Sequence, residues 1–420
     1  MECLEIIGGC PLHGSVRVQG SKNAALPILA ASVLHRGVTV LHNCPKILDV
    51  IYMTEILREL GCKIEWEGHT LTIDAGELTS HRVSPLLGEK MRSSIILMGS
   101  LTGRMGEAQI PFPGGCSIGA RPIDLHIEGL KALGVNVEER DGMLHSKAEY
   151  IRGGEVALKF PSVGATENLI LAGVLAKGKT TIYGAAREPE IQELCAFLNA
   201  KGARIRGAGS DQIRILGVQR LEDSHHDLMP DRIVAGTYLM AAVATRGSIL
   251  LEKAPWDQMG AVLEAAEKMG ASWEVGDRGL KIEAEHANKP VPRLVTEVYP
   301  GFPTDLQSQA IAVLSMARGE SVISEQVFES RYRAAGQLNR MGAWITVDGR
   351  EAWIRGGGRL RGSRVVVPDL RGGAALVIAG LCADGRTVVE DEGYIRRGYE
   401  DISADLRKLG GNIRIVEQEQ

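Results

Sequence analysis

A glycine-rich loop with one thiol is the stretch of this 420-residue chain best suited to chemistry. Residues 111–121 read P-F-P-G-G-C-S-I-G-A-R, so Cys116 lies among glycines that let a backbone approach a ligand closely. Arg121 and free backbone N–H groups can lower the pKa of this thiol and make it reactive. The alternative is that Cys116 is a small buried apolar residue, as most free cysteines are.

Basic residues at the starts of apolar helices are a second candidate group. Lys22, Arg92 and Arg371 each stand where such a helix is expected to begin. A cation in the first turn opposes the helix dipole, so a bound anion would compensate for it. These three residues are therefore predicted to contact an anionic ligand.

Ordinary capping is the alternative explanation for polar residues at helix starts. It accounts for Thr304 and for Ser162 or Asp231, but not for the three cations. Asp305 fits either explanation by position alone. Arg331 and Arg397 are weaker candidates, because an arginine on a surface helix or loop is usually solvated.

The elements that must position these residues recur along the chain. A helix ending in glycine, followed by a strand, appears six times at intervals of about 70 residues. Each glycine is predicted to take the left-handed conformation that ends a helix. The glycines are Gly61, Gly134, Gly202, Gly270, Gly342 and Gly410.

Upstream of each glycine lies a nearly all-apolar stretch, which predicts a helix buried on every side. The stretches are residues 23–34, 93–101, 166–176, 234–245, 306–317 and 372–383. Each is followed by glycine and a short β-branched strand, such as residues 38–41. One unit of this α/β chain is therefore a buried helix, a strand, a surface helix and a hairpin.

Six units are too many for one core of this size, so we predict two lobes of three units. One lobe is residues 21–229, which carries the Cys116 loop, and the other is residues 1–20 with 230–420. The boundaries fall at Gly20–Lys22 and in the polar stretch 222–230. If the buried helices of a lobe are parallel, their N-termini gather, and two facing lobes make an anion-binding cleft.

The unit with the Cys116 loop departs from the other five. Between the glycine before its strand and the glycine after its surface helix it spans 28 positions, from Gly106 to Gly134, against 23 to 25 elsewhere. The extra residues fall in the loop. Since function tends to reside in such insertions, this favours a functional Cys116.

The composition predicts a soluble, well-cored protein and argues against several function classes. The formal charge is −4, so nothing suggests nucleic acid, and neither a signal peptide nor a run long enough to cross a bilayer is recognised. Seven scattered cysteines favour reduced thiols in the cytoplasm over a zinc site. No phosphate-loop or dinucleotide fingerprint suggests a cofactor.

Six runs of residues occur in order along almost the whole chain. They are G-S-K-N-A-A-L-P from Gly20, P-G-G-C-S-I-G-A-R-P-I-D-L-H from Pro113, P-S-V-G-A-T-E-N from Pro161, P-D-R-I from Pro230, Y-P-G-F-P-T-D-L-Q-S-Q from Tyr299 and R-G-Y-E from Arg397. Together they resemble the UDP-N-acetylglucosamine 1-carboxyvinyltransferases, a family of enolpyruvyl transferases. The cysteine loop and the P-T-D-L-Q run are specific to that family.

The resemblance implies a fold and a reaction. The fold is the two-lobed enolpyruvyl transferase fold, an inside-out α/β barrel whose lobes each have three repeats of buried parallel helices surrounded by sheets and surface helices. The reaction transfers enolpyruvate from phosphoenolpyruvate to the 3′-hydroxyl of UDP-N-acetylglucosamine and releases phosphate, as the committed step of peptidoglycan precursor synthesis. Both substrates are small molecules, and no cofactor, metal, nucleic acid or membrane is implied.

The resemblance also implies roles for particular residues. Cys116 would be the acid and Asp305 the base of an addition–elimination. Lys22, Arg121 and Arg397 would face the phosphate of phosphoenolpyruvate, with Arg331 and Arg371 near its carboxylate. Contacts to the UDP-sugar would come from Arg92, Arg121, Pro122, Ile123, Asp124, Leu125, Ser162, Val163, Gly164, Asp305 and Val327, with support from Asn23 and Asp369.

Two other functions remain to be weighed. A 3-phosphoshikimate 1-carboxyvinyltransferase would have the same fold and chemistry with a different acceptor, which the loop thiol and the P-T-D-L-Q run argue against. A repeat scaffold that only senses a nucleotide-sugar would not need the set Lys22, Cys116, Arg121, Asp305 and Arg397.

Overall fold

A computed structural model describes residues 2–113 and 123–417. The described residues divide into two compact units. The first unit comprises residues 20–113 and 123–229, and the second comprises residues 2–19 and 230–417. Each unit has its own core of buried apolar side chains.

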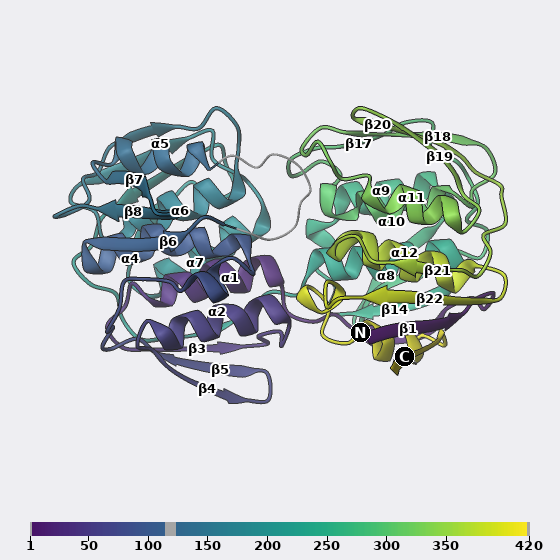
Figure 1. Cartoon of the computed structure of the whole chain (residues 1–420), viewed down its shortest axis with the longest axis horizontal. Coiled ribbons are helices and arrows are strands. Elements are labelled where there is room, and N and C mark those ends of the chain that lie inside the picture. Colours follow the sequence, from purple (N-terminus) through teal and green to yellow (C-terminus); the bar gives the residue numbers. More distant parts are fainter. Residues whose placement is uncertain (1, 114–122, 418–420) are drawn as a thin grey trace. The chain divides into compact units, whose positions relative to one another are not determined.

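Three copies of one pattern build the first unit (Figure 1). The first copy is α1 (Lys22–Ser32), β3 (Val38–His42), α2 (Leu48–Glu59), β4 (Lys63–Glu67) and β5 (Thr70–Asp74). The second begins with the short α3 (Pro85–Gly88) and the 3-10 helix η1 (Arg92–Ile96), followed by α4 (Leu97–Met105), β6 (Glu107–Pro111), α5 (Asp124–Ala132), β7 (Asn136–Arg140) and β8 (Met143–Lys147). The third is α6 (Val163–Val174), β10 (Lys179–Tyr183), α7 (Pro189–Ala200), β11 (Arg204–Arg206) and β12 (Gln212–Leu216).

The second unit repeats the pattern three more times. Its first copy is α8 (Arg232–Thr245), β14 (Ser248–Glu252), η2 (Trp256–Gln258), α9 (Gly260–Lys268), β15 (Ser272–Gly276) and β16 (Gly279–Glu283). Its second is η3 (Thr304–Leu306), α10 (Gln307–Leu314), β18 (Glu320–Glu325), α11 (Arg333–Arg340), β19 (Trp344–Asp348) and β20 (Glu351–Arg355). Its third is α12 (Leu370–Cys382), β22 (Arg386–Asp391), η4 (Ile395–Arg397), α13 (Ile402–Lys408) and β23 (Asn412–Glu417).

Each copy contributes one sheet, and most sheets gain a strand from elsewhere in the chain. Five further strands are added in parallel: β2 (His13–Arg17), β9 (Glu155–Ala157), β13 (Ser224–Asp227), β17 (Leu294–Thr296) and β21 (Arg364–Val366). The resulting orders are β13-β3-β5-β4, β6-β8-β7 and β11-β12-β10-β9 in the first unit, and β15-β16-β14-β2, β17-β18-β20-β19 and β21-β22-β1-β23 in the second. In the last sheet β1 (Glu2–Ile7) runs antiparallel to both of its neighbours.

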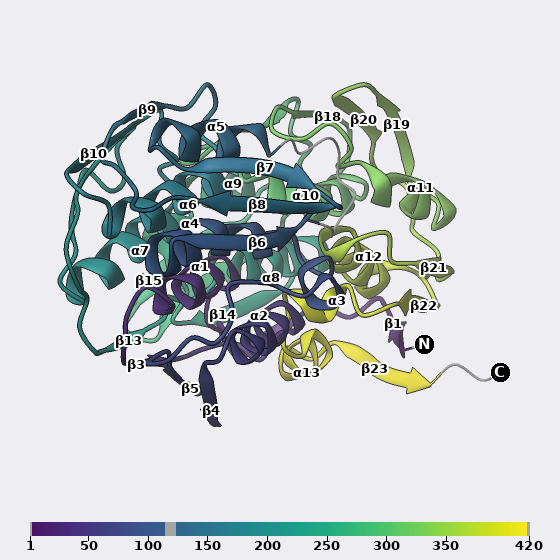
Figure 2. The ribbon, with the colours of Figure 1, turned by 60° about the vertical axis from the view of Figure 1, so that its left-hand side comes forward.

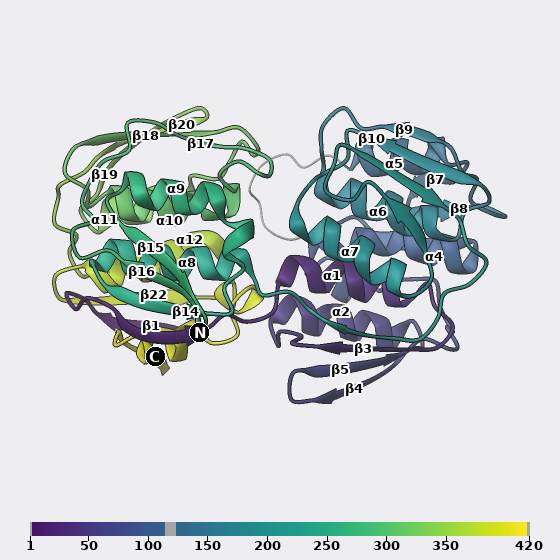
Figure 3. The ribbon, with the colours of Figure 1, turned by 180° about the vertical axis from the view of Figure 1, so that it is seen from behind.

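The apolar helices lie inside and the sheets lie outside. All eight residues of α10 and the first twelve of α8 are buried, as expected for helices that are apolar on every side. Figure 1 shows α8, α10 and α12 inside the second unit, and Figure 3 shows β14, β15 and β16 over α8 from behind. In the first unit, β6 and β8 cover α4 on the outside (Figure 2).

The predicted helix ends are confirmed. All six repeat glycines have positive φ, from 81° at Gly134 to 109° at Gly61. At Gly61 a Cβ would also lie 2.7 Å from the backbone nitrogen of Thr79, so glycine is required there for space as well as for conformation.

Some predicted boundaries differ from the observed ones. The helix expected to begin at Thr166 begins at Val163, because Ser162 already caps it, and the stretch expected as a helix from Ser93 starts as the 3-10 helix η1. The polar stretch 222–230, predicted to hold a lobe boundary, also contains a strand, because four of its residues form β13. This strand pairs with β3 although its side chains are polar, since backbone hydrogen bonds alone define an edge strand.

A buried lysine makes the stability of the first unit depend on pH. Lys201 caps α7, is 0% exposed, and donates from Nζ to Thr39 Oγ1 (2.9 Å) and Ser224 Oγ (3.2 Å). Burial lowers its pKa from 10.5 to about 8, although Asp223 opposes the shift. The unfolded chain therefore binds more protons than the folded chain between these two pH values, and stability from this group rises with pH across that window.

We expect the free energy of unfolding of the wild type to rise by roughly 3 kcal/mol relative to that of Lys201→Met between pH 7 and pH 10.5, as measured by urea unfolding. Lys179→Met, which removes an exposed lysine of the same unit, should give a difference that does not change with pH. An equally flat difference for Lys201→Met would mean that the buried amine stays protonated.

Candidate active site

Helix α1 presents a lysine at its first residue. Ser21 caps the helix by accepting from the backbone N–H of Ala24 (3.3 Å). Lys22 Nζ lies 2.6 Å from Asp49 Oδ2, with 12% and 3% of the two side chains exposed. Asn23 follows and is half-buried. The nearly buried carboxylate of Asp49 thus holds the ammonium at the helix start.

Arg92 occupies the corresponding position in the second copy. It is the first residue of η1 and is half-buried. Burial lowers the pKa of its guanidinium, which remains a cation at any physiological pH because the ordinary value is so high. An anion near this site would restore the electrostatic free energy that burial costs.

The start of α6 offers backbone N–H donors at a half-buried, capped helix end. Ser162 caps the helix by accepting from Ala165 N (3.4 Å), and Val163 and Gly164 are half-buried. A Cβ on Gly164 would lie 3.2 Å from Cε1 of His126, so glycine lets the helix pack closely on that ring.

Asn168 fixes the orientation of His126. Its Nδ2 lies 3.1 Å from His126 Nδ1 and 3.1 Å from the carbonyl of Ile95, and its Oδ1 accepts from Gly99 N at 2.6 Å. Because Nδ2 donates, Nδ1 of His126 accepts and Nε2 carries the proton in the neutral ring. An N–H group is therefore held beside Gly164.

Three more predicted contacts lie at the start of α5. Ile123 precedes the helix and is half-buried, Asp124 is its exposed first residue, and Leu125 is half-buried. Cys116, Arg121 and Pro122 lie outside the described residues, so their predicted roles rest on the sequence.

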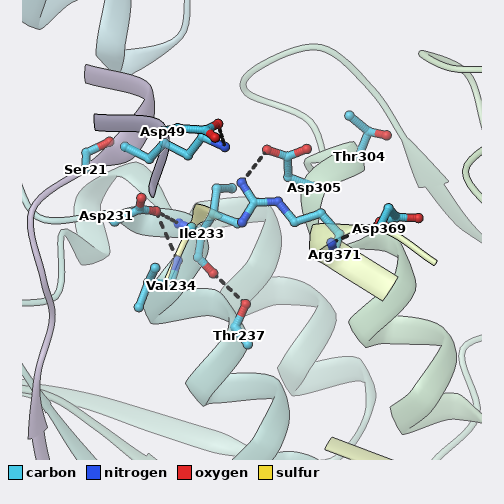
Figure 4. A network of polar contacts seen from close by, with 12 residues as sticks. Ser21, Asp49, Asp231, Ile233, Val234, Thr237, Thr304, Asp305, Asp369 and Arg371 are labelled. Carbon is cyan, nitrogen blue, oxygen red and sulfur yellow. Dashed lines mark hydrogen bonds and ion pairs between the residues drawn. The ribbon is translucent and has the colours of Figure 1, made fainter. Parts of the chain in front are cut away.

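In the second unit, one carboxylate joins two buried arginines. Asp305, in η3, accepts from Arg331 through Oδ1 and from Arg371 Nη2 through Oδ2, the latter at 2.8 Å. Each arginine is 5% exposed. Figure 4 shows the Arg371 side chain extending from α12 to Asp305. The three residues come from three separate segments of the chain and converge on one point.

Arg371 is held at both its backbone and its side chain. Asp369 caps α12 by accepting from the N–H groups of Arg371 (3.0 Å) and Gly372 (2.9 Å). Burial alone would lower the pKa of the guanidinium, but the charges of Asp305, Tyr399 and Asp231 raise it above its ordinary value. This arginine is a fixed, permanent cation.

Glu325 joins this cluster to the predicted contact at Val327. It is 0% exposed, and its Oε1 accepts from the N–H groups of Val327 (2.8 Å) and Phe328 (3.0 Å). Its Oε2 accepts from the hydroxyl of Thr304 (2.9 Å), which in turn accepts from Arg331 Nε (3.2 Å). One carboxylate therefore positions both a loop and the threonine before Asp305.

Arg397 ends η4 and is half-buried. Its N–H donates to the carbonyl of Tyr394 at 3.1 Å. The turn that carries it also contains Tyr399, whose hydroxyl lies 2.8 Å from that of Thr237.

One prediction about helix starts needs correction. Thr304 was expected to cap a helix, but Pro303 occupies the cap position and the Thr304 hydroxyl instead bonds Glu325 and Arg331. Lys22 and Arg371 also pair with carboxylates of the protein, Asp49 and Asp305, and their contact with an anionic ligand stays a prediction. The capping expected of Ser162 and Asp231 is confirmed.

Sequence reasoning missed Asp49 and Glu325. Asp49 lies in the first turn of a surface helix and Glu325 at the end of a strand, positions at which an acidic residue is usually solvated. Nothing in the sequence pairs them with residues about 20 to 30 positions away. Their burial is the property that distinguishes them, and it depends on the fold.

Replacing Glu325 should show how much the hydrogen bonds that its carboxylate accepts contribute to the free energy of unfolding. Glu325→Ala removes the acceptor of two backbone N–H groups and of Thr304, and we expect it to lower the free energy of unfolding by about 3 kcal/mol. Glu325→Gln keeps one acceptor and should cost less than half of that in the same urea titration. Glu329→Ala, which removes an exposed carboxylate in the same loop, should change stability by under about 0.5 kcal/mol. Equal losses of stability in Glu325→Ala and Glu325→Gln would contradict the role of Glu325 as a hydrogen-bond acceptor.

Within residues 2–113 and 123–417, no group of three or more metal-ligating side chains is positioned to hold a metal ion. No helix among those residues is long and apolar enough to cross a membrane. Six described cysteines are free thiols: Cys3, Cys10, Cys44, Cys62, Cys195 and Cys382.

Comparison with known proteins places the chain in a family. The family model for EPSP synthase (3-phosphoshikimate 1-carboxyvinyltransferase) matches residues 6–406. A solved structure of the enolpyruvyl transferase NikO from Streptomyces tendae is 25% identical, with a TM-score of 0.88 over 99% of both chains. The predicted fold class is therefore confirmed.

Two curated relatives are more similar in sequence. UDP-N-acetylglucosamine 1-carboxyvinyltransferase 2 of Caldanaerobacter subterraneus subsp. tengcongensis is 49% identical over 97% of this chain and 98% of its own. UDP-N-acetylglucosamine 1-carboxyvinyltransferase 1 of Symbiobacterium thermophilum is 47% identical over 98% of this chain and 94% of its own. With a family match across nearly its whole length and relatives of this similarity, the chain belongs to the enolpyruvyl transferase family.

Proposed function

We propose that this enzyme transfers the enolpyruvyl group of phosphoenolpyruvate to the 3′-hydroxyl of UDP-N-acetylglucosamine and releases phosphate, in the first step of peptidoglycan precursor synthesis. The observation that carries the proposal is the 49% identity, over nearly full length, to a relative named for this reaction. The cluster of Asp305, Arg331 and Arg371 supports it, because an acid–base group beside two fixed cations suits an anionic substrate that must gain and lose protons. The substrates are small molecules present in the cytoplasm, where we place the enzyme.

The reaction requires balanced proton transfers. In the addition, the acceptor oxygen bonds to C2 of phosphoenolpyruvate, Asp305 takes the hydroxyl proton, and Cys116 gives a proton to C3. In the elimination the proton flow reverses: a proton leaves C3 for the Cys116 thiolate, the bond between C2 and the phosphate oxygen breaks, and the departing phosphate takes the proton held by Asp305. No electrons are gained or lost overall, so the chemistry needs no redox cofactor.

The cations are assigned to the anionic groups of the substrates. Lys22, Arg121 and Arg397 bind the phosphate of phosphoenolpyruvate, and Arg331 and Arg371 bind its carboxylate. In the described structure both oxygens of Asp305 accept from these two arginines. When a substrate carboxylate takes over those donors, the Asp305 oxygens become available to the acceptor hydroxyl.

The remaining candidates hold the UDP-sugar. Backbone N–H groups at the start of α6 can bind phosphate oxygens, as free helix N-termini commonly do. The assigned residues are Arg92, Arg121, Pro122, Ile123, Asp124, Leu125, Ser162, Val163, Gly164, Asp305 and Val327, with Asn23 and Asp369 in support.

Phosphate release on mixing the purified protein with both substrates tests the proposal. Phosphate should appear only when UDP-N-acetylglucosamine is present with phosphoenolpyruvate. Phosphate release when 3-phosphoshikimate replaces UDP-N-acetylglucosamine would instead identify the protein as a 3-phosphoshikimate 1-carboxyvinyltransferase, the activity in the name of the matching family model. Binding of the nucleotide-sugar without any phosphate release would make the protein a sensor.

A further inference from the structure

The segment of the second unit that carries Arg397 is a tight turn with an anchor at each end. At its start, Asp391 accepts from the N–H groups of Tyr394 (2.8 Å) and Ile395 (3.1 Å). In its middle, the carbonyl of Ile395 accepts from Gly398 N (3.1 Å) and Tyr399 N (3.0 Å). These bonds fix the entry and the middle of the turn.

The peptide groups on either side of Tyr399 are held by a side chain from the other end of the sequence. Gln19 Nε2 donates to the carbonyl of Gly398 at 3.1 Å, and Gln19 Oε1 accepts from the N–H of Glu400 at 3.0 Å. The single amide therefore clamps two peptide groups, located one and three residues after Arg397. These partners are 379 and 381 positions from Gln19 along the chain.

Gln19 is itself held firmly. Its carbonyl accepts from the N–H of Asp231 at 2.9 Å, and Asp231 caps α8 through Ile233 N (2.8 Å) and Val234 N (3.0 Å). The preceding Val18 donates to the carbonyl of Glu252 at 3.0 Å, which continues the pairing of β2 with β14. The clamp is thus part of a sheet and a helix cap, two rigid elements.

The clamped turn also packs against Arg371. A Cβ on Gly398 would lie 2.9 Å from Leu370 Cδ2, so glycine leaves room for that side chain, and 3.5 Å from Arg371 Nη1, so the turn lies in contact range of the guanidinium. A shift of the turn would move Arg397 and change the surroundings of Arg371 together.

We propose that Gln19 is a positioning residue for phosphoenolpyruvate, because it fixes the turn that carries Arg397 and whose Gly398 lies against Arg371. This inference rests on the proposed function, in which both arginines bind that substrate. Gln19 touches no substrate atom in this proposal and acts through the backbone of residues 398–400. Binding a small, highly charged anion depends on cations held in place beforehand, since any ordering on binding lowers affinity.

The test is Gln19→Met, which keeps the length of the side chain and removes both hydrogen bonds. We expect KM for phosphoenolpyruvate to rise about tenfold, corresponding to roughly 1.4 kcal/mol, while KM for UDP-N-acetylglucosamine changes by less than twofold. Inhibition by inorganic phosphate should weaken in parallel. Gln192→Met is the matched control, because Gln192 also holds a backbone carbonyl, that of Arg187 at 3.2 Å, but lies in the first unit. It should leave both KM values unchanged.

Amide hydrogen exchange of residues 394–400 gives a second readout that does not depend on activity. Exchange in this segment should be faster in Gln19→Met than in wild type. Faster exchange with an unchanged KM for phosphoenolpyruvate would overturn the inference, and so would equal increases in both KM values. Wild-type protein that releases no phosphate from the two substrates would instead count against the proposed function.

Discussion

Asp305→Asn is expected to lower kcat by about a thousandfold, because general acid–base groups contribute 10² to 10⁴ in rate. The amide keeps the shape of the side chain but cannot take the proton of the acceptor hydroxyl. Steady-state phosphate release at saturating substrates measures the loss. Asp348→Asn, in an exposed position of the same unit, serves as the control. A variant within tenfold of wild type would exclude Asp305 as the base.

The same substitution should expose a second property of the cluster. Asp305→Asn leaves Arg331 and Arg371, both nearly buried, beside a neutral amide, and breaking a buried ion pair typically costs about 3–5 kcal/mol. An anionic ligand can replace the missing charge. We therefore expect phosphoenolpyruvate to raise Tm more in Asp305→Asn than in wild type. An equal rise in both proteins would mean that Arg331 and Arg371 do not bind this substrate.

Cys116→Ser is expected to abolish turnover or slow it by at least a hundredfold while UDP-sugar binding stays largely intact. The thiol is assigned a proton transfer, whereas other residues hold the sugar. Calorimetric titration with UDP-N-acetylglucosamine and phosphate release measure the two properties separately. Cys10→Ser, at an exposed cysteine, is the matched control. Wild-type turnover in Cys116→Ser would remove the thiol from the mechanism.

Alkylation by an epoxide that resembles phosphoenolpyruvate should occur first at Cys116. Burial raises the pKa of Cys62 and Cys195 to about 12, so these thiols supply almost no thiolate. Cys10 is the exposed competitor among the described cysteines. Peptide mapping that finds Cys10 modified faster than Cys116 would contradict a lowered pKa in the loop.

Cys116→Asp should keep some activity with a shifted pH optimum, because a carboxyl group can also donate a proton.

The repeat pattern could be predicted from sequence because it depends on local requirements. Only glycine freely takes the left-handed conformation seen at positions such as Gly61 and Gly410, and only a helix surrounded by protein is apolar on all faces. The order of the strands within each sheet could not be predicted in the same way. The parallel strand β13, for example, is polar, and its pairing with β3 depends on long-range backbone hydrogen bonds rather than on composition.

In the candidate site, too, residues with a local sequence pattern could be predicted and residues defined by long-range contacts could not. Lys22 and Arg371 were identified because a cation at a helix start is unusual, and the structure places both there. Their partners Asp49 and Asp305 were not predicted as such, because an ion pair between residues far apart in sequence has no local pattern. Gln19 escaped notice for the same reason. A glutamine at this position does not stand out in the sequence, and only its hydrogen bonds to residues 398 and 400 identify its role.

The place of β1 between β22 and β23 constrains the order in which the protein can mature. Ile7 pairs with Arg386 on one side and with Asn412 on the other, so β1 is synthesised long before either partner exists. The first unit needs no such partner and can fold while the rest of the chain is still being made. Until β22 emerges, β1 is an unpaired strand able to associate with other nascent chains, and one of its edges stays open until β23 follows. We therefore expect the last repeat to close only after translation of its final strand, and chaperone dependence to fall on the second unit.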